Sequence, residues 1–135
     1  MKQHLIKLRK NDDLRQEIES YCRREQVKAA YIGTCVGSLQ NVRLRKGSTK
    51  STCTIEGPFE ICALSGTLST SESHLHISIS DEDYQVLGGH LIYGTLVLNT
   101  AEIVIVELDY YEIIRDRSEG NDYKELKITK MEGGN

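Results

Sequence analysis

The stretch that decides the fold of this chain is His74–His90, HLHISISDEDYQVLGGH. Its first seven residues alternate, with histidine or serine at even positions and leucine or isoleucine at odd positions. A period of two is typical of a strand with one buried face. Polar residues 81–84 predict a turn, and residues 86–92 predict a second short strand. The stretch therefore predicts a β-hairpin, and it contains three of the four histidines of the chain.

The pairing register of this hairpin determines where the histidines lie. With an odd loop, His76 lies opposite His90, and the isoleucines share the other face. A loop shorter by two residues pairs His74 with His90 and keeps the same faces. An even loop would move His90 among the isoleucines, because a slip of one residue turns every side chain to the opposite face. The pattern favours three imidazoles on one face, unless Gly88 and Gly89 carry a β-bulge that shifts the count.

Three imidazoles on one sheet face form a ligand set for a metal ion. Residues i and i+2 of a strand lie about 6.6 Å apart on one face, so two rings can lean onto one ion at Zn–N distances of about 2.0–2.1 Å. A third imidazole from the neighbouring strand leaves the fourth position open, as in exchangeable or catalytic zinc sites. The sequence thus predicts a site for Zn²⁺ or a similar divalent cation at His74, His76 and His90. The alternative is a polar sheet face on which these histidines hydrogen-bond serines.

Composition indicates an ordinary single domain of 135 residues, with 39% hydrophobic and 27% charged residues. A net charge of −3 does not favour a general attraction to nucleic acid. The start MKQHLIKLRK lacks the apolar run of a signal peptide, and no segment is long enough to span a bilayer. The four cysteines form no CxxC pair and are expected to be reduced core residues of a cytoplasmic protein.

Outside the hairpin, the patterns predict one helix and several strands. Asn11, Asp12 or Asp13 is expected to cap a helix that ends near Glu25. Breaks are expected at Gly37-Ser38 and at Gly66, and the apolar run 29–36 is expected to be covered on both faces. Strands are predicted over residues 3–9, 29–36, 42–45, 59–64, 67–69, 94–98, 101–108, 110–114 and 123–130.

This element count predicts an α+β domain with a twisted, antiparallel or mixed sheet and one main helix. Residues 1–135 are expected to form one domain, in which residues 115–135 are a charged C-terminal extension. A small sheet of this kind has exposed edges, and assembly into a closed oligomer is one way to cover them.

Several blocks of sequence resemble the PPC domain, a family conserved in plants and prokaryotes. The blocks occur in the order of the family and cover most of the chain: LRKNDDL, AAYIGTCVGSLQNVRLR (29–45), GPFEICALSGTLS (57–69), HLHISISDEDYQVLGGHL (74–91) and TAEIVIVEL (100–108). The resemblance implies a twisted, mixed, largely antiparallel sheet with one main helix, assembled as a homotrimer. It also implies that His74, His76 and His90 hold a zinc-like ion. Tyr84 is a departure, because the family usually has glycine in this turn.

Family members are often described as DNA-binding proteins or regulators, and in plants the domain is joined to AT-hook segments. The Arg-Gly-Arg-Pro core of an AT-hook is absent from this sequence. One basic cluster, Arg43, Arg45, Lys46 and Lys50, could contact phosphates, and a trimer would present three copies of it. On charge alone, a solvated strand face and loop is the more common interpretation of such a cluster.

Two further hypotheses concern small molecules. The order of the histidines is similar to that of zinc-dependent acetolactate decarboxylases, whose fold is similar, and this favours a decarboxylase- or lyase-like enzyme acting on a small keto or hydroxy acid. In that case Glu60 is a candidate general base or a residue that orients a ligated histidine, although a carboxylate in a strand is as often simply solvated. The last alternative is a trimer that binds small molecules, with the metal in a structural role.

Overall fold

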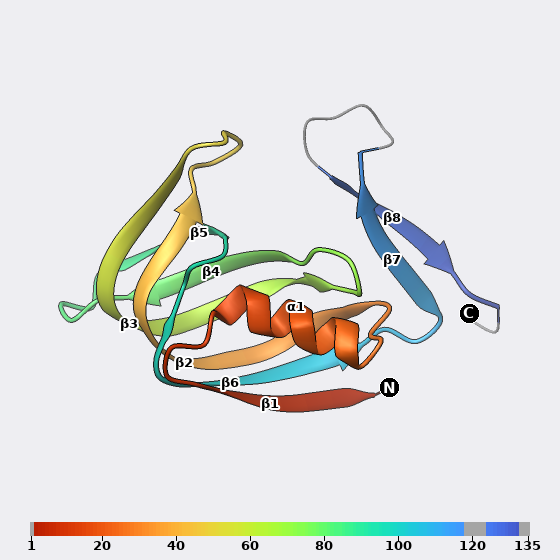
Figure 1. Cartoon of the computed structure of the whole chain (residues 1–135), viewed down its shortest axis with the longest axis horizontal. Helices are drawn as coiled ribbons and strands as arrows, with labels where there is room; N and C mark the ends of the chain where they lie inside the picture. The colour runs from red at the N-terminus through yellow and green to blue at the C-terminus, as the bar shows by residue number, and fades with distance from the viewer. Residues whose placement is uncertain (1, 118–123, 133–135) are drawn as a thin grey trace.

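Six strands and one helix form the body of the protein. The computed structural model describes residues 2–117 and 124–132 (Figure 1). Its elements in chain order are β1 (Gln3–Arg9), α1 (Leu14–Arg24), β2 (Ala30–Arg45), β3 (Thr52–Leu68), β4 (His74–Ser80), β5 (Val86–Leu91), β6 (Val97–Glu107), β7 (Tyr111–Asp116) and β8 (Glu125–Lys130). One sheet has the strand order β1-β6-β2-β3-β4-β5, and β7 pairs with β8 in a second sheet. The predicted α+β class is confirmed.

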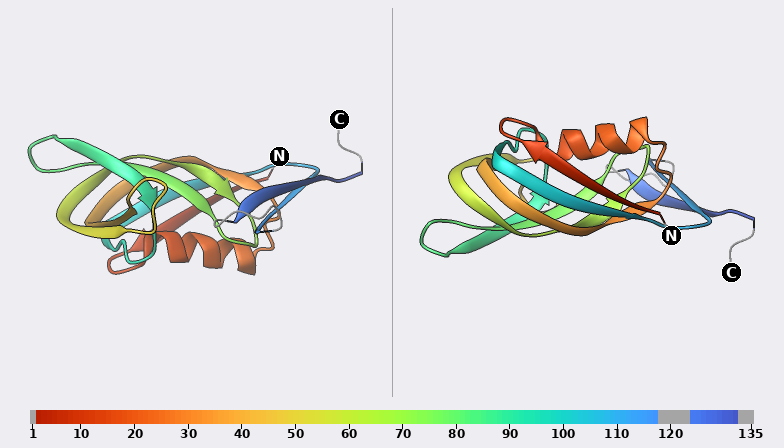
Figure 2. Two further views of the ribbon diagram at one scale, coloured as in Figure 1. Left: turned by 90° about the horizontal axis from the view of Figure 1, so that it is seen from above. Right: turned by 90° about the horizontal axis from the view of Figure 1, so that it is seen from below.

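Every strand pairing within residues 2–117 and 124–132 is antiparallel. The sequence predicted an antiparallel or a mixed sheet, and the antiparallel alternative is the one that these residues form. Short hairpins join most of the consecutive strands, and a parallel pair would need a long crossover connection. The long strand β2 pairs with β6 near its start and with β5 at its end, where Arg45 lies opposite His90. Two such partners require the sheet to curl, and Figure 2 shows this curvature from both sides.

Helix α1 covers one face of the sheet. The side chain of Asp13 caps it by accepting a hydrogen bond of 3.1 Å from the backbone N–H of Gln16. The predicted helix is therefore confirmed, with Asp13 as its cap. The buried stripe Leu14, Ile18 and Cys22 faces the sheet. The largest fully buried side chains of the core include Leu39, Leu68, Leu75, Ile79, Leu91, Ile103 and Ile105.

Strands β2, β3 and β6 are longer than predicted. The break expected at Gly37-Ser38 does not exist, since β2 runs on through register shifts on either side of Leu39. A Cβ atom at Gly37 would lie 2.3 Å from the carbonyl oxygen of Thr100, so this glycine permits close strand packing. Likewise, β3 continues through Gly66, and β6 unites the two strands predicted over residues 94–108. Gly37 and Gly66 led to predicted breaks, but hydrogen bonding to the neighbouring strands keeps β2 and β3 continuous at these glycines.

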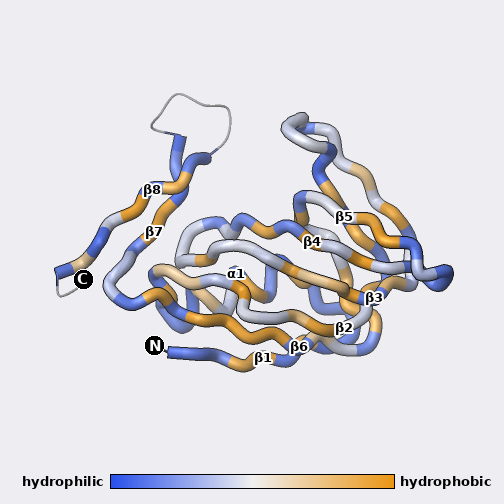
Figure 3. Tube along the Cα trace, turned by 180° about the vertical axis from the view of Figure 1, so that it is seen from behind, coloured by the Kyte–Doolittle hydropathy of each residue, from blue (hydrophilic) through white to orange (hydrophobic). Residues whose placement is uncertain are grey.

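The sheet face opposite α1 is exposed and partly apolar. The expectation that residues 29–36 are covered on both faces is wrong, because Tyr31 and Val36 are 39% and 59% exposed. Leu5 of β1, 78% exposed, pairs with Val104 of β6, and Tyr31 pairs with Val106. Figure 3 shows hydrophobic residues concentrated along β6 and its neighbours. Of the four cysteines, two are buried as predicted, but Cys53 and Cys62 are exposed.

The β7–β8 hairpin stands apart from the main sheet (Figure 1). It is attached to the body by the backbone N–H of Ile113, which donates to the carbonyl oxygen of Lys28 at 3.0 Å. The side chain of Arg115 also reaches Thr67 of β3, with Nη2 2.6 Å from Oγ1. The predicted charged C-terminal extension, residues 115–135, lies partly outside the described residues, and its described part includes the end of β7 and all of β8.

Candidate metal centre

The three histidines of the β4–β5 hairpin lie together on one face. His76 is the Cα partner of His90, and Ile77 and Ile79 pair with Gly89 and Leu87, as the odd-loop register predicts. The imidazole centroids lie 4.9, 5.4 and 5.6 Å from one another. One nitrogen from each ring lies within 4.8 Å of the other two. The predicted registration is confirmed, and it produces a compact cluster of three possible metal ligands.

The donor set fits a zinc ion. Three nitrogens bound to one tetrahedral zinc at about 2.0–2.1 Å lie about 3.4 Å apart, so rotation of the exposed His74 and His76 rings could bring the three nitrogens to this spacing. Nδ1 of His90 is buried and has no hydrogen-bond partner among the described residues. A buried imidazole nitrogen without a partner costs free energy, and a metal ion would satisfy it. Zinc needs no particular d-electron geometry and accepts imidazole readily.

The surroundings keep these imidazoles in the form that binds metals. Burial, together with the positive charges of Arg45 and Arg15, lowers the pKa of His90 to about 4. Burial also lowers the pKa of His74, together with the charge of Arg115. Neutral imidazole is the metal-binding species, so both rings present a free lone pair at neutral pH without first losing a proton.

Glycine at position 88 sets the distance between the two strands that carry the histidines. A Cβ atom there would lie 2.0 Å from the carbonyl oxygen of Ile77, whereas one at Gly89 would meet nothing closer than 3.7 Å. The pairing from His76 to Ser80 shows no register shift, so the bulge considered at these glycines does not occur. Gly88 therefore permits the close approach that brings His90 to the histidines of β4.

The turn between the two strands explains the departure at Tyr84. This residue has φ of 62°, in the left-handed region that glycine adopts without strain. The side chain of Asp81 stabilises the turn by accepting hydrogen bonds of 2.9 Å from the backbone N–H groups of Asp83 and Gln85. The glycine that the family resemblance leads us to expect at this position would adopt this backbone conformation without strain.

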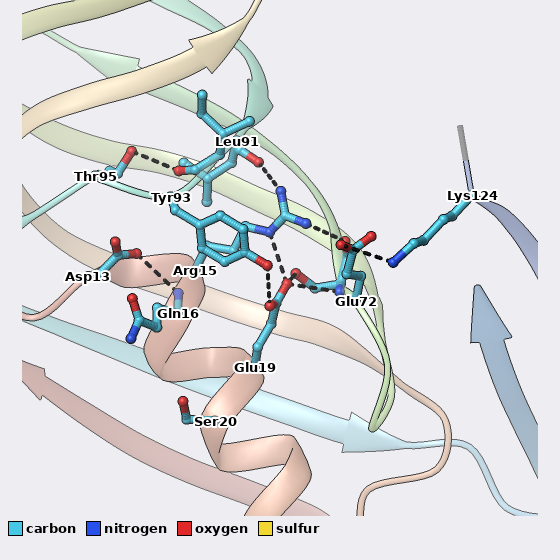
Figure 4. Close-up of polar contacts among 12 residues, drawn as sticks. Asp13, Arg15, Gln16, Glu19, Ser20, Glu72, Leu91, Tyr93, Thr95 and Lys124 are labelled. Atoms are coloured by element: carbon cyan, nitrogen blue, oxygen red, sulfur yellow. Dashed lines mark hydrogen bonds and ion pairs between the residues drawn. The ribbon is translucent and has the colours of Figure 1, made fainter. Parts of the chain in front are cut away.

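Beside the histidines lies a buried cluster that the sequence did not predict (Figure 4). Glu19 of α1 accepts hydrogen bonds from Arg15, Ser73 and Tyr93 at 2.6–3.0 Å. Arg15 also donates to the carbonyl oxygens of Ser73 and Leu91, the residues next to His74 and His90. The cluster thus ties the helix to both histidine strands. In the sequence, the signal that could have indicated this cluster is the pair Arg15 and Glu19, which have opposite charges and lie four residues apart beside the apolar stripe of the helix.

The predicted basic cluster is divided by the structure. Arg45 lies opposite His90 and lines a cavity with it. Arg43 donates to the carbonyl oxygen of Tyr93 at 3.5 Å and to Thr52 at 3.3 Å. Lys46 and Lys50 are exposed in the β2–β3 connection. Of the four basic residues of the predicted cluster, all of which the structure describes, only Lys46 and Lys50 are exposed.

Glu60 is not brought together with the histidines. It is exposed on β3, where its partners are Ser38 and Ser80, whereas His76 pairs with Ser65, five residues further along β3. Five strand residues span about 17 Å. Glu60 instead lines a separate cavity next to the β4–β5 turn. The structure gives it no position from which it could act on a metal-bound ligand in the same chain.

The fold and the histidine cluster agree with the relationship that sequence comparison shows. Residues 1–109 match the Plants and Prokaryotes Conserved (PCC) domain, and the chain belongs to this family. It is 34% identical over 126 residues to a bifunctional protein GlmU from Synechococcus sp., covering 93% of the chain. It is 32% identical over 87 residues to the AT-hook motif nuclear-localized protein 10 from Arabidopsis thaliana, which covers 58% of the chain. The chain spans about a fifth of the length of the GlmU relatives and a quarter of the plant protein.

Solved structures share the whole architecture. A hypothetical protein from Salmonella enterica, 32% identical, superposes with a TM-score of 0.89, covering 96% of this chain and 94% of that one. A plant- and prokaryote-conserved protein from Pyrococcus horikoshii, 25% identical, gives 0.78 with 93% and 92% covered. A protein from Archaeoglobus fulgidus described as metal-containing, 24% identical, gives 0.76 with 94% of each chain covered. In the described part of this chain, no helix is both long and apolar enough to cross a membrane.

Proposed function

We propose that this PCC domain is a metal-binding module in which His74, His76 and His90 hold one Zn²⁺ or similar divalent cation. The observation that supports it is the set of three imidazole nitrogens within 4.8 Å of one another. In addition, the buried Nδ1 of the His90 ring has no hydrogen-bond partner among the described residues. Three protein ligands leave a coordination position for a small ligand. When bound, zinc would supply a Lewis acid able to polarise a carbonyl oxygen, which also supports a lyase-like enzyme as the alternative.

Metal analysis tests this proposal directly. Protein purified without chelator or added metal is analysed for bound elements, alongside His76→Ala and His4→Ala variants. We expect about one zinc per chain in the wild type and in His4→Ala, because His4 is bonded instead to Tyr21 and Glu107. The His76→Ala variant should lose most of it. A wild type that is empty and takes up no added zinc would contradict the proposal.

The assembly we propose is a homotrimer. The support is the exposed apolar face of β1, β6 and β2, which includes Leu5, Tyr31 and Val36, because patches of this kind often mark contacts between chains. Sedimentation velocity should give about three times the chain mass of 15.3 kDa. A Val36→Lys substitution should reduce that mass, since it would bury an unpaired charge in the contact. A wild-type monomer at micromolar concentration would contradict the trimer.

DNA binding is a second candidate function. It is supported by the exposed Lys46 and Lys50 in the β2–β3 connection, of which a trimer would present three copies. A protein from Bacteroides thetaiotaomicron with the same fold is described as a candidate for DNA binding. Binding to an arbitrary duplex should weaken steeply with salt, and a double Lys46→Gln, Lys50→Gln variant should lower that salt dependence. Absence of binding at low salt would exclude this function.

A further inference from the structure

A large cavity adjoins the histidine cluster on the side of the β7–β8 hairpin. Its volume is about 710 Å³, enough for a small organic molecule. His74 and His90 form part of its wall, so the cavity reaches the metal centre. Arg115 and Lys124 of the hairpin region also line it. The cavity is therefore shared between the main sheet and the C-terminal hairpin.

Cationic side chains dominate the wall of this cavity. Five of its lining residues are cations and two are anions: Arg15, Arg45, Arg115, Arg117 and Lys124, against Glu72 and Glu125. The carboxylate of Glu19 lies behind the wall and pairs with Arg15. Glu72 pairs with Lys124, with 3.4 Å between Nζ and Oε1. Counting these three carboxylates against the five cations leaves an excess of two positive charges before any metal is bound.

Arg115 is placed where it can act together with the metal centre. Its Nη2 donates to the hydroxyl of Thr67 at 2.6 Å, and Thr67 is the Cα partner of His74. The guanidinium is thus held beside the first histidine by a neutral hydroxyl, and the carboxylates of Glu72 and Glu125 also act on its charge. A guanidinium has five N–H donors in a planar fork that matches carboxylate and phosphate oxygens.

We infer that this cavity is a binding site for a small oxyanion, a carboxylate or a phosphate, which Arg115 holds at the side of the three-histidine centre. The inference deepens the proposed function and rests on it for the identity of the neighbouring metal. Zinc bound by three neutral imidazoles keeps its full double charge, and the nearby guanidiniums add to it. An anion held by the guanidinium would also compensate the charge of a metal ion bound by the three histidines.

The inference assigns a role to a segment outside the family match. The PCC domain match ends at residue 109, and Arg115, Arg117 and Lys124 all follow it. The histidines would therefore belong to the common domain, whereas the residues that select the ligand come from the C-terminal hairpin. A matched control exists on the same hairpin, because the exposed Lys130 is at the end of β8 and does not line the cavity.

Calorimetric titration tests this site with two probes, sodium pyruvate for carboxylates and inorganic phosphate for phosphates. Each is added to the wild type, Arg115→Gln and Lys130→Gln, with zinc loaded at one equivalent and with zinc removed. Zinc content is measured on the same samples. We expect one probe to bind, Arg115→Gln to weaken its binding about tenfold or more, and Lys130→Gln to leave it unchanged. The probe that binds identifies the oxyanion.

A second variant keeps the test valid if Arg115→Gln does not fold. Thr67→Val removes only the hydroxyl that positions Arg115, at a half-buried site, and should weaken anion binding several-fold with zinc content unchanged. If zinc is bound but neither probe binds, or both variants bind as the wild type does, the oxyanion site is wrong and the metal proposal stands. If no sample takes up zinc but Arg115-dependent binding persists, the metal proposal fails and the oxyanion site is retained.

Discussion

Two polar clusters lie side by side in this protein, and they differ in whether their polar atoms have partners. Around Glu19, both carboxylate oxygens accept hydrogen bonds, and the buried Arg15 donates to one carboxylate and two carbonyl groups. Among the histidines, the buried Nδ1 of His90 has no partner in the described residues. A cluster whose polar atoms all have partners, which we call the complete cluster, stabilises the fold. In a preformed cluster that lacks a partner, the incomplete cluster, binding of a ligand lowers the free energy by supplying that partner.

The largest expected effect comes from breaking the complete cluster. Glu19→Gln keeps the shape of the side chain but removes the charge that compensates the buried Arg15. We expect the free energy of unfolding, measured with urea, to fall by about 3–5 kcal/mol. Glu17→Gln is the control, since this half-buried residue lies on the same helix and should change stability by less than about 1 kcal/mol. Equal effects in both variants would contradict the structural role of Glu19.

Zinc should stabilise only a chain that keeps all three histidines, His74, His76 and His90. At a free zinc concentration of about 100 times Kd, linkage adds about 2.7 kcal/mol to the unfolding free energy of the wild type. His76→Ala should gain almost nothing from zinc. Without metal, its stability should match the wild type within about 0.5 kcal/mol, because His76 is exposed. Thermal unfolding with and without zinc checks this, and a strongly destabilised metal-free variant would show a structural role instead.

The two glycines before His90 provide a sharper comparison within the hairpin. Gly88→Ala places a Cβ against the carbonyl of Ile77 and should cost about 1–3 kcal/mol, with weaker zinc binding as β4 and β5 separate. Gly89→Ala meets only ordinary van der Waals contacts and should be nearly neutral. Urea unfolding and zinc titration of both variants would show whether the spacing of the strands controls the site. Similar behaviour of the two variants would contradict that role of Gly88.

The smallest expected effect is the pH dependence of the complete cluster. Burial alone would raise the pKa of Glu19, but hydrogen bonds from Ser73, Tyr93 and Arg15 outweigh it and lower the pKa below its usual 4.5. The lowered folded-state pKa means that this stabilisation is present above the unfolded pKa and is lost as pH falls through the folded one. Stability measured between about pH 5 and pH 3 should decline less steeply in Glu19→Gln than in the wild type. Parallel curves would show that Glu19 makes no contribution to this decline.

Much of the fold and the histidine geometry could be predicted because both depend on local alternation. The period of two in residues 74–80 determined which side chains share a face, and the odd loop then placed His76 opposite His90. Helix α1 could also be predicted from local signals, namely the cap at Asp13 and the apolar stripe that follows it. The errors concern strand continuity at Gly37 and Gly66, where pairing with neighbouring strands overrides the tendency of glycine to interrupt a strand.

The sequence by itself determined the class of the fold, the family and the placement of three histidines on one sheet face. Only the tertiary structure decided what surrounds those histidines. Arg15, Arg45 and Arg115 lie on three different elements, and no spacing along the chain indicates that they meet beside the histidines. Periodicity reports which residues share a face of one element, because it follows from backbone geometry. The charge of a site depends instead on how distant elements pack, which a single sequence does not encode in any local pattern.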